Sequence, residues 1–597
     1  MFKIITFHIF LALTLFETSL CTLNALDYQV EFVGNLENET HILLEETSQL
    51  STLQNSPASS AAALQRRADK DISNLLKALQ SQAYYGAKVK TSINFDLTPA
   101  VVKIEIETGP IYPLTSFSIV SSKETVNDED YQYPFASIDI QDLEITINNP
   151  AFPKDVLNAE EILLKRLERE GYPLAKIVQR EVLADQTSKS VSVTLHLDSG
   201  HLARFGPTSI TGQKRVQDIF FCRKITWQEG ALYQPEQVAR TLNALEASGL
   251  FSSITIRYAD EVDENGMLPM NITVTEAKHR SIGLGLNYDT DLGPGLSAEW
   301  ENRNLRGRGE KLSFVTNLWL RKKEGTLRYT IPDFYRPRQD LIWTAEALNL
   351  DTRGFEESSL SLSGIIERQL NDNIRFSYGG MFKRLRNWDS DNNGSFNLLK
   401  APLQFMWHKT NSLLDPTQGS VVLIKSTPTL ETKSPRFAYS INTISGSIYV
   451  PLRKDQRFVI AAKATLGSIW GANKHSIPPS ERFYAGSDNL LRGYRYLTVS
   501  PLNEENKPIG GRSMMVYSLE ARMRFSECFG FVTFWDIGNV YANSHPQINH
   551  KQLQAVGVGA RYHTPVGPIR LDIAFPLNPR KHVDNRFQIY FSIGQSF

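Results

Sequence analysis

The sequence predicts a membrane β-barrel of about 16 antiparallel strands, preceded by three small α+β domains. Two patterns carry this prediction. From Arg280 to the last residue, apolar side chains alternate with polar residues or glycine, which is the period of a strand with one face in an apolar environment. From Leu26 to Lys278, a helix, a glycine turn and strands recur instead. Spanning helices are not expected, because no run of about 18 apolar residues occurs.

The composition excludes several classes of protein. The chain has 597 residues, of which 41% are hydrophobic, enough to form large cores. It carries 64 basic and 64 acidic residues, so the whole chain lacks the basic excess of a nucleic-acid-binding protein. The three cysteines, Cys21, Cys222 and Cys528, are too few for a disulfide framework or a cysteine-rich zinc site. Because the 11 histidines are dispersed, no metal or cofactor is expected.

Motifs of the common enzyme classes are missing from the sequence. It contains no Gly-x-Ser-x-Gly elbow, no Walker loop and no His-Glu-x-x-His helix. Gly283 and Gly285 lack the third glycine of a dinucleotide fingerprint, and the alternation of a strand explains them better. We therefore expect that the protein is not an enzyme.

Residues 1–25 have the features of an export signal. Lys3 supplies a positive charge, residues 4–16 form a short apolar core, and Ala25 offers a small residue for cleavage. The apolar core is too short to anchor a spanning helix.

Residues 26–109, 110–200 and 201–278 are expected to form the three α+β domains. In each, apolar residues at helical spacing precede a glycine turn and an alternating strand. The helix faces are marked by Ile72, Leu75, Leu76 and Leu79 in the first domain, Ile162, Leu163 and Leu167 in the second, and Val238, Leu242 and Leu245 in the third. The strands that follow are expected at 101–106, 191–197 and 270–274.

The barrel is expected to occupy residues 279–597. Its alternating part, from 280 to 597, has 318 residues. A membrane strand of about 10 residues with its share of turn and loop uses roughly 20, which gives about 16 strands, an even number as in such barrels. A soluble β-sandwich also alternates, but one of this length would normally be divided into domains.

The last third of the chain separates the two faces of the strands most clearly. The apolar row of one strand comprises Met515, Tyr517, Leu519, Ala521, Met523 and Phe525, and its opposite face comprises Ser518, Glu520, Arg522 and Arg524. In the next strand, Asp536 lies opposite the row of Thr533, Trp535 and Ile537. By this parity, Glu520 and Asp536 are expected to face the barrel lumen.

The segment from Arg482 to Tyr494 is too irregular for a strand, and it could be an ordinary loop with a glycine turn. Its Arg492-Gly493-Tyr494 sequence resembles the pore-loop motif of the BamA-like assembly-barrel superfamily. Phe534-Trp-Asp-Ile-Gly-Asn-Val540 resembles a second motif of that superfamily. Further matches lie at 280–289, 293–295, 304–309, 415–419 and 566–572, and one departure is Gly486-Ser487, where many relatives have a glycine pair. The N-terminal domains resemble POTRA domains, and three of them look most like the TamA branch of the superfamily.

The resemblance implies a protein of the cell outer membrane with periplasmic POTRA domains. Such a protein assists, without ATP, the assembly and secretion of autotransporter-type and other outer-membrane proteins. Arg492, Gly493 and Tyr494 would lie on a loop folded into the pore, where Arg492 would pair with Asp536 or Glu520. The implied partners are a TamB-like periplasm-spanning protein, unfolded outer-membrane clients and outer-membrane lipid.

The resemblance also implies a lateral seam between the first and last strands of the barrel. The seam residues would be Ile282, Leu284 and Leu286 on the first strand and Ile589, Phe591 and Ile593 on the last. A weakly paired seam could open and offer unpaired edges to a client strand. The last strand is expected to run from Phe587 to Phe597, and its terminal aromatic residue looks like a C-terminal sorting signal.

Three rival readings stay open at this point. A two-partner-secretion transporter would conduct a polypeptide through the lumen of a similar barrel, but it would typically have two POTRA domains and a plug helix, where Tyr28 to Val33 suggests a strand. An assembly barrel of the BamA type would have five such domains, and this chain is too short by about 160 residues if each domain takes roughly 80. A passive porin would need no such domains.

Overall fold

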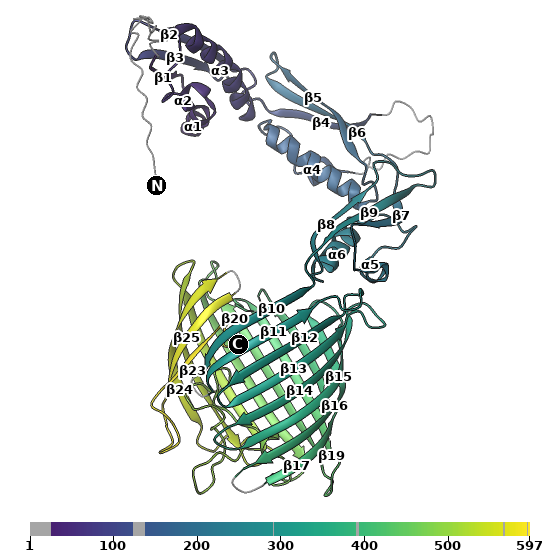
Figure 1. Ribbon diagram of the computed structural model, residues 1–597. Coiled ribbons are helices and arrows are strands. Elements are labelled where there is room, and N and C mark those ends of the chain that lie inside the picture. The colour runs from purple at the N-terminus through teal and green to yellow at the C-terminus, as the bar shows by residue number, and fades with distance from the viewer. Residues whose placement is uncertain are drawn as a thin grey trace, which may run out of the picture. The chain divides into compact units, whose positions relative to one another are not determined.

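The computed structural model describes residues 26–122, 138–289, 292–389, 393–412, 414–564, 567–593 and 595–597 (Figure 1). The chain forms two compact units. One comprises Met1–Thr208, Trp227–Val238 and Arg257–Met270, and the other comprises Ser209–Thr226, Ala239–Ile256 and Asn271–Phe597. The expected export signal, residues 1–25, lies outside the described residues. In the part of the chain that the structure describes, no helix is both long and apolar enough to cross a membrane.

The first small sheet has the strand order β1-β3-β2. Its module consists of β1 (Tyr28–Val33), α1 (Asn38–Thr47), α2 (Gln49–Thr52), α3 (Ala61–Ser81), β2 (Lys88–Asn94) and β3 (Ala100–Glu107). The apolar face of α3, with Leu64, Leu75 and Leu79, is fully buried in one cluster with Val102 and Ile104 of β3. Helix and sheet therefore share one core.

The second small sheet repeats this plan with the order β4-β6-β5. Its module consists of β4 (Leu114–Ser121), the 3-10 helix η1 (Ile140–Leu143), α4 (Pro153–Arg169), β5 (Lys176–Asp185) and β6 (Ser190–Asp198). Pro153 opens α4, where its missing N–H costs no hydrogen bond. Leu163 and Leu167 of α4 are buried with Val193 and Leu195 of β6.

The third small sheet has the order β7-β9-β8. Its elements are β7 (Arg204–Thr211), α5 (Asp218–Lys224), α6 (Pro235–Glu246), β8 (Phe251–Tyr258) and β9 (Met267–Glu276). Among the described residues, each small sheet therefore has its last strand in sequence at its centre, so one supersecondary plan recurs three times.

The large sheet has seventeen segments in the order of the sequence, and every pairing between them is antiparallel. They are β10 (Arg280–Asp289), β11 (Gly293–Asn302), β12 (Lys311–Trp319), β13 (Lys322–Ile331), β14 (Gln339–Asp351), β15 (Glu356–Gln369), β16 (Ile374–Trp388), β17 (Asn393–Lys400), β18 (Leu403–Thr410), β19 (Gly419–Glu431), β20 (Ala438–Pro451), β21 (Phe458–Gly471), β22 (Ser513–Arg524), β23 (Phe529–Tyr541), β24 (Leu553–Thr564), β25 (Gly567–Pro576) and β26 (Gln588–Ile593). Because β17 and β18 both pair with β16 and β19, they form one strand interrupted near Pro402. The barrel of about 16 antiparallel strands is therefore confirmed.

Burial alternates along the barrel strands as the sequence predicts. In β23, Phe531 and Trp535 are exposed on the outer face, while Val532, Phe534 and Asp536 are buried on the inner face. An outer wall that exposes large apolar side chains around a sheet requires an apolar environment.

The expected last strand, Phe587 to Phe597, is wrong at its far end. The paired strand β26 stops at Ile593, and the described residues beyond it make contacts on the lumen side of the barrel. The Gln595 side chain donates to Asp415 Oδ1 at 2.9 Å, and the backbone oxygen of Phe597 accepts a hydrogen bond from Arg522 at 2.9 Å. Polar partners inside the barrel thus replace continued pairing, a preference that the apolar alternation could not reveal.

A partly buried carboxylate joins the last strand of the third module to residues 214–216 of the same module, just before the barrel begins. Glu276, at the end of β9, accepts hydrogen bonds on one oxygen from the backbone N–H groups of Lys214, Arg215 and Val216, at 2.7 to 2.8 Å. Burial alone would raise the pKa of Glu276, but these hydrogen bonds and nearby His279 outweigh it, so the pKa lies below its usual value.

We expect the contribution of Glu276 to depend on pH. A carboxyl whose pKa is depressed by folding stabilises the structure above its unfolded pKa, and this stabilisation is lost as the pH falls from about 4.5 through the lower folded value. Glu276→Gln should therefore speed hydrogen exchange of residues 214–216 at neutral pH, and the difference from wild type should vanish in acid. Glu229→Gln, at an exposed glutamate, should change nothing. Equal exchange of wild type and Glu276→Gln at neutral pH would contradict this account.

Candidate functional site: a loop fastened inside the barrel

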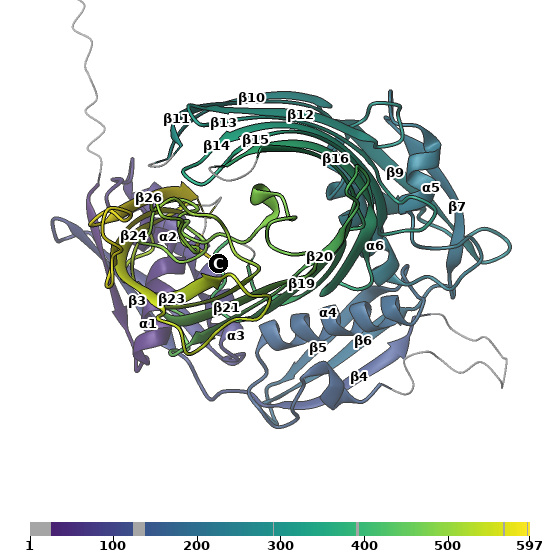
Figure 2. The same cartoon turned by 90° about the horizontal axis from the view of Figure 1, so that it is seen from below.

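The segment 472–512, between β21 and β22, is the long connection that carries the Arg492-Gly493-Tyr494 motif. Figure 2 shows coil and a short helical turn, in the green of this part of the chain, inside the ring of strands. Much of the segment is buried, including Phe483, Leu491 and Tyr494, which belong to one cluster with Met514 and Val540 of the wall. The loop is therefore packed into the lumen rather than extended into solvent.

The first fastening point of the loop is Glu481, at the end of the 3-10 helix η2 (Pro479–Glu481). Its carboxylate forms ion pairs with Lys400 at 2.5 Å and Lys383 at 3.1 Å, and all three side chains are largely buried. Lys383 also pairs with Glu357 at 2.9 Å. The start of the loop is thus attached to the wall formed by β15, β16 and β17.

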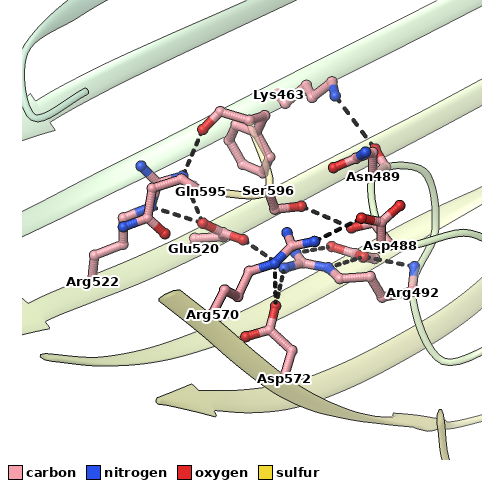
Figure 3. A network of polar contacts seen from close by, with 12 residues as sticks. Lys463, Asp488, Asn489, Arg492, Glu520, Arg522, Arg570, Asp572, Gln595 and Ser596 are labelled. Atoms are coloured by element: carbon pink, nitrogen blue, oxygen red, sulfur yellow. Dashed lines mark hydrogen bonds and ion pairs between the residues drawn. The ribbon is translucent and has the colours of Figure 1, made fainter. Parts of the chain in front are cut away.

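The second fastening point is Arg492, on a different part of the wall (Figure 3). Its Nε and backbone N–H donate to Asp536 Oδ2 at 2.8 and 2.9 Å, and its Nη2 donates to Asp536 Oδ1 at 2.8 Å. Its Nη1 donates to Glu520 Oε1 at 2.6 Å and lies 3.6 Å from Asp572 Oδ2. A planar guanidinium with five donors suits this bidentate arrangement, which a lysine could not reproduce.

Water is excluded from this group of charges. Arg492 is 1% exposed, Asp536 is 1% and Glu520 is fully buried. The Arg492 guanidinium carbon also lies 3.5 Å from the centre of the Phe534 ring, a cation–π contact. Burying charges is costly, so the group is weak evidence for net stability, but removing one partner would leave a buried charge uncompensated. The arrangement therefore specifies where the loop tip must lie.

The two residues that follow Arg492 fix the backbone beside it. Gly493 has φ +90°, a conformation that side chains disfavour, and a Cβ there would lie 2.8 Å from Ala555 Cβ. The Tyr494 hydroxyl lies 2.8 Å from the Gln554 carbonyl oxygen and 2.7 Å from Asn578 Oδ1. Close backbone approach and a buried hydroxyl thus hold the loop tip against β24 and the connection that follows β25.

The loop is also attached to the last strand of the barrel. The Gly493 N–H donates to the Tyr590 hydroxyl of β26 at 2.9 Å. Arg570 of β25 links Asp488 of the loop, at 2.8 Å, to the Ser592 hydroxyl of β26, at 2.9 Å. Figure 3 shows Arg570 between the loop and the wall, and Ser596 donating to the Asp488 carbonyl oxygen at 3.0 Å. The lumen side of the last strand therefore faces the loop.

The two ends of the large sheet differ from its interior. β10 and β26 lie next to each other (Figure 2), but among the described residues no ladder of hydrogen bonds joins them. β26 pairs with β25 through six residue pairs, whereas β10 pairs with β11 through ten. Without a neighbour on one flank, Ile282 is 78% exposed and Leu284 and Leu286 are each 85% exposed.

The expected site residues are thus found in two places. Arg492, Gly493 and Tyr494 lie in the lumen with Asp536 and Glu520, and Arg492 contacts both carboxylates rather than one. Ile282, Leu284 and Leu286 lie on the open edge of β10, and Ile589 and Phe591 lie on β26, at 39% and 63% exposure. The backbone of Ile593 ends β26, but its side chain lies outside the described residues. Phe597 lies near Tyr449, with ring centres 6.5 Å apart.

Sequence reasoning missed several members of the site. Asp572 and Arg570 lie on the lumen face of β25, where strand parity places them opposite Ile569, Leu571 and Ile573, but parity gave them no role in the site. Arg561 pairs with Asp572 at 2.5 Å and is also found by parity in β24. Tyr590 lies on the opposite face from Ile589 and Phe591, so parity also turns it toward the lumen, but parity does not give its contact with Gly493. Glu481 gave no such signal, because it lies in irregular backbone.

Comparisons with known proteins agree with this geometry. Residues 304–597 match the Omp85 superfamily domain. The chain is 22% identical over 493 residues to the outer membrane protein assembly factor BamA of Neisseria meningitidis serogroup B, covering 72% of this chain and 61% of that protein. It is also 22% identical over 555 residues to BamA of Nitratidesulfovibrio vulgaris, covering 85% and 64%. The chain thus spans about three-fifths of the length of these relatives.

A solved structure supports the fold. The crystal structure of BamA from Haemophilus ducreyi lacking POTRA domains 1–3 aligns with a TM-score of 0.67 and 17% identity, over 80% of this chain and 99% of that one. The barrel fold expected from the motifs is therefore confirmed, and the match of residues 304–597 agrees with the resemblance to the superfamily. The assignment to the TamA branch stays a prediction.

We expect the Arg492 contact to be strongly coupled to its carboxylates. In a double-mutant cycle of Arg492→Ala and Asp536→Ala, the interaction free energy should be at least about 1.5 kcal/mol, because each single change leaves a buried charge unpaired. The measurement is denaturant unfolding of the folded barrel. The exposed pair Arg453 and Asp455, at 3.4 Å, is the matched control, with coupling below about 0.5 kcal/mol. Additive effects at Arg492 and Asp536 would contradict a specific contact.

Proposed function

We propose that this protein lies in the outer membrane, with its N-terminal modules in the periplasm, and assists the insertion of outer-membrane proteins through the seam between β10 and β26. The single observation that carries this proposal is the unpaired seam beside an otherwise continuous antiparallel wall. Exposed strand edges invite pairing with another strand, and most proteins protect them. Here the two edges are left next to each other at the membrane-facing wall.

An opened seam would work as a template. A client strand could add to β10 through backbone hydrogen bonds, which require no particular client sequence. The free energy would come from the client burying its own strands and apolar surface, so neither ATP nor a catalytic group is needed. We infer that the clients are autotransporter-type and other outer-membrane proteins. The edge strands of the small sheets, such as the largely exposed β5, offer a second place for unfolded chains to bind.

The loop would control the seam. Because Tyr590 and Ser592 of β26 are tied to the loop directly or through Arg570, moving β26 away from its position strains these contacts. The Arg492 contacts hold the loop tip, so they resist seam opening even though they lie on other strands. Coupling of this kind is reciprocal: fixing the seam should also fix the loop.

A finer assignment follows from the three repeated modules. They support a subunit of the TamA type, and its expected partner is a TamB-like protein that spans the periplasm. The alternative is a two-partner-secretion transporter that conducts a polypeptide through the lumen. That alternative requires the loop to leave a lumen in which both Glu481 and Arg492 are buried in ion pairs, which favours the seam over the lumen as the route.

We expect Tyr590→Phe to loosen loop and seam together. The change removes one hydroxyl, which accepts from Gly493 N–H and lies 3.4 Å from the Tyr494 carbonyl oxygen, and it keeps the ring. Hydrogen exchange should rise both at residues 492–494 and in β26. Tyr562→Phe, on the exposed outer face of β24, is the control and should change neither. Faster exchange in β26 alone would argue against coupling.

The direct test of the seam is a crosslink on a background that lacks Cys222 and Cys528. Leu284→Cys with Phe591→Cys places one thiol on each edge, and the oxidised barrel should fold normally but fail to assemble clients. The control is Leu571→Cys with Phe591→Cys, which joins residues already paired in the β25–β26 ladder. This crosslink should leave assembly intact. Normal assembly by the Leu284–Phe591 crosslinked barrel would exclude seam opening and favour the lumenal route.

A further inference from the structure

A hollow of about 500 Å³ lies between the end of α5 and the turn that joins β13 to β14. Two arginines, Arg223 of α5 and Arg336 of the turn, line it together with Phe334, Tyr335 and the thiol-bearing Cys222. It belongs to neither the lumen nor the seam. Because successive antiparallel strands reverse direction, this turn lies at the end of the barrel where β10 begins, next to the third module.

The turn adopts a backbone that its sequence does not favour. Asp333, Tyr335 and Arg338 have φ of +50°, +60° and +60°, although none is glycine. Such conformations cost free energy and persist only where other contacts enforce them. Here Asp333 Oδ1 accepts from the Arg338 N–H at 2.9 Å, and the Gln339 side chain donates to the Phe334 carbonyl oxygen at 2.9 Å. The result is an enforced turn that leaves Tyr335 88% exposed.

In the described part of the chain, the charges around the hollow leave two cations without an ion-pair partner. Lys224 pairs with Asp333 at 2.8 Å, and both side chains are mostly buried, so the one carboxylate of the lining is already neutralised. Among the described residues, Arg223 and Arg336 make no ion pair and are exposed. Arg338, by contrast, pairs with Asp372 at 3.0 Å. The lining thus presents two free guanidinium groups beside two aromatic rings.

We propose that this hollow binds the phosphate of a phospholipid headgroup. Guanidinium groups bind phosphate through paired hydrogen bonds, and exposed aromatic side chains at the end of a membrane wall settle at the headgroup level. A soluble phosphate would explain the arginines but not the exposed Tyr335 beside Phe334. The proposal rests on the membrane placement proposed above but not on client assembly. A lipid held there would join the third module to the rim of the barrel.

Two native cysteines make the test direct. Cys222 lines the hollow, and Cys528, also exposed, lies in the turn between β22 and β23 at the same end of the barrel. The rate of maleimide alkylation of each thiol is followed by mass spectrometry in the full chain. We expect phosphatidylglycerol nanodiscs, compared with maltoside micelles, to slow alkylation of Cys222 several-fold relative to Cys528. Arg223→Gln with Arg336→Gln should abolish this relative protection.

Control variants and inorganic phosphate distinguish binding of a lipid at this hollow from shielding by the bilayer and from binding of a soluble anion. Arg453→Gln with Arg457→Gln, exposed arginines of the turn between β20 and β21, should leave the protection of Cys222 intact. Inorganic phosphate added to micelles should protect little, and full protection by it would replace the lipid with a soluble anion. Protection that persists in the Arg223 and Arg336 variant would mean that the bilayer merely shields Cys222. The proposal is overturned by that persistence, and equally if nanodiscs do not protect Cys222 at all. Both outcomes are independent of any effect of the variants on client assembly.

Discussion

The contact between Arg492 and the carboxylates of the lumen is the interaction on which the rest of the site depends. The guanidinium reaches Asp536 and Glu520 from one loop residue and so fixes the loop against β22 and β23. Once it is fixed, Gly493 comes within hydrogen-bond distance of Tyr590, and Asp488 within that of Arg570. The last strand therefore acquires on its lumen side the partners that it lacks along its free edge.

This arrangement explains how a barrel can keep an unpaired seam without losing its fold. A short β25–β26 ladder alone would leave the last strand weakly held. Contacts to the loop add attachment without closing the edge, and buried ion pairs give that attachment a defined geometry rather than a large stability. The first fastening point, Glu481, keeps the start of the loop on the wall formed by β15, β16 and β17, so the loop is held to the wall both at its start and at its tip.

Much of this could be predicted from the sequence. The alternation of apolar and polar residues predicted the barrel. It also predicted that Asp536 and Glu520 face inward, because β22 and β23 separate their two faces clearly. The pairing of Arg492 came from a motif rather than from periodicity, since residues 472–512 follow no regular pattern. The hydrogen bond between Gly493 and Tyr590 and the inward path of residues 595–597 could not be predicted, because they depend on contacts between segments distant in sequence. The ion pairs of Glu481 with Lys383 and Lys400 could not be predicted for the same reason.

The central claim is that the loop holds the seam. The most direct measurement is the distance distribution between spin labels at Leu284 and Phe591 in the folded barrel, with and without Arg492→Ala. The account predicts a narrow distribution of label distances when Arg492 is present. When Arg492 is replaced by alanine, the distribution should become broader and extend to longer distances. An unchanged distribution in a variant whose loop tip is shown by hydrogen exchange to be released would contradict it.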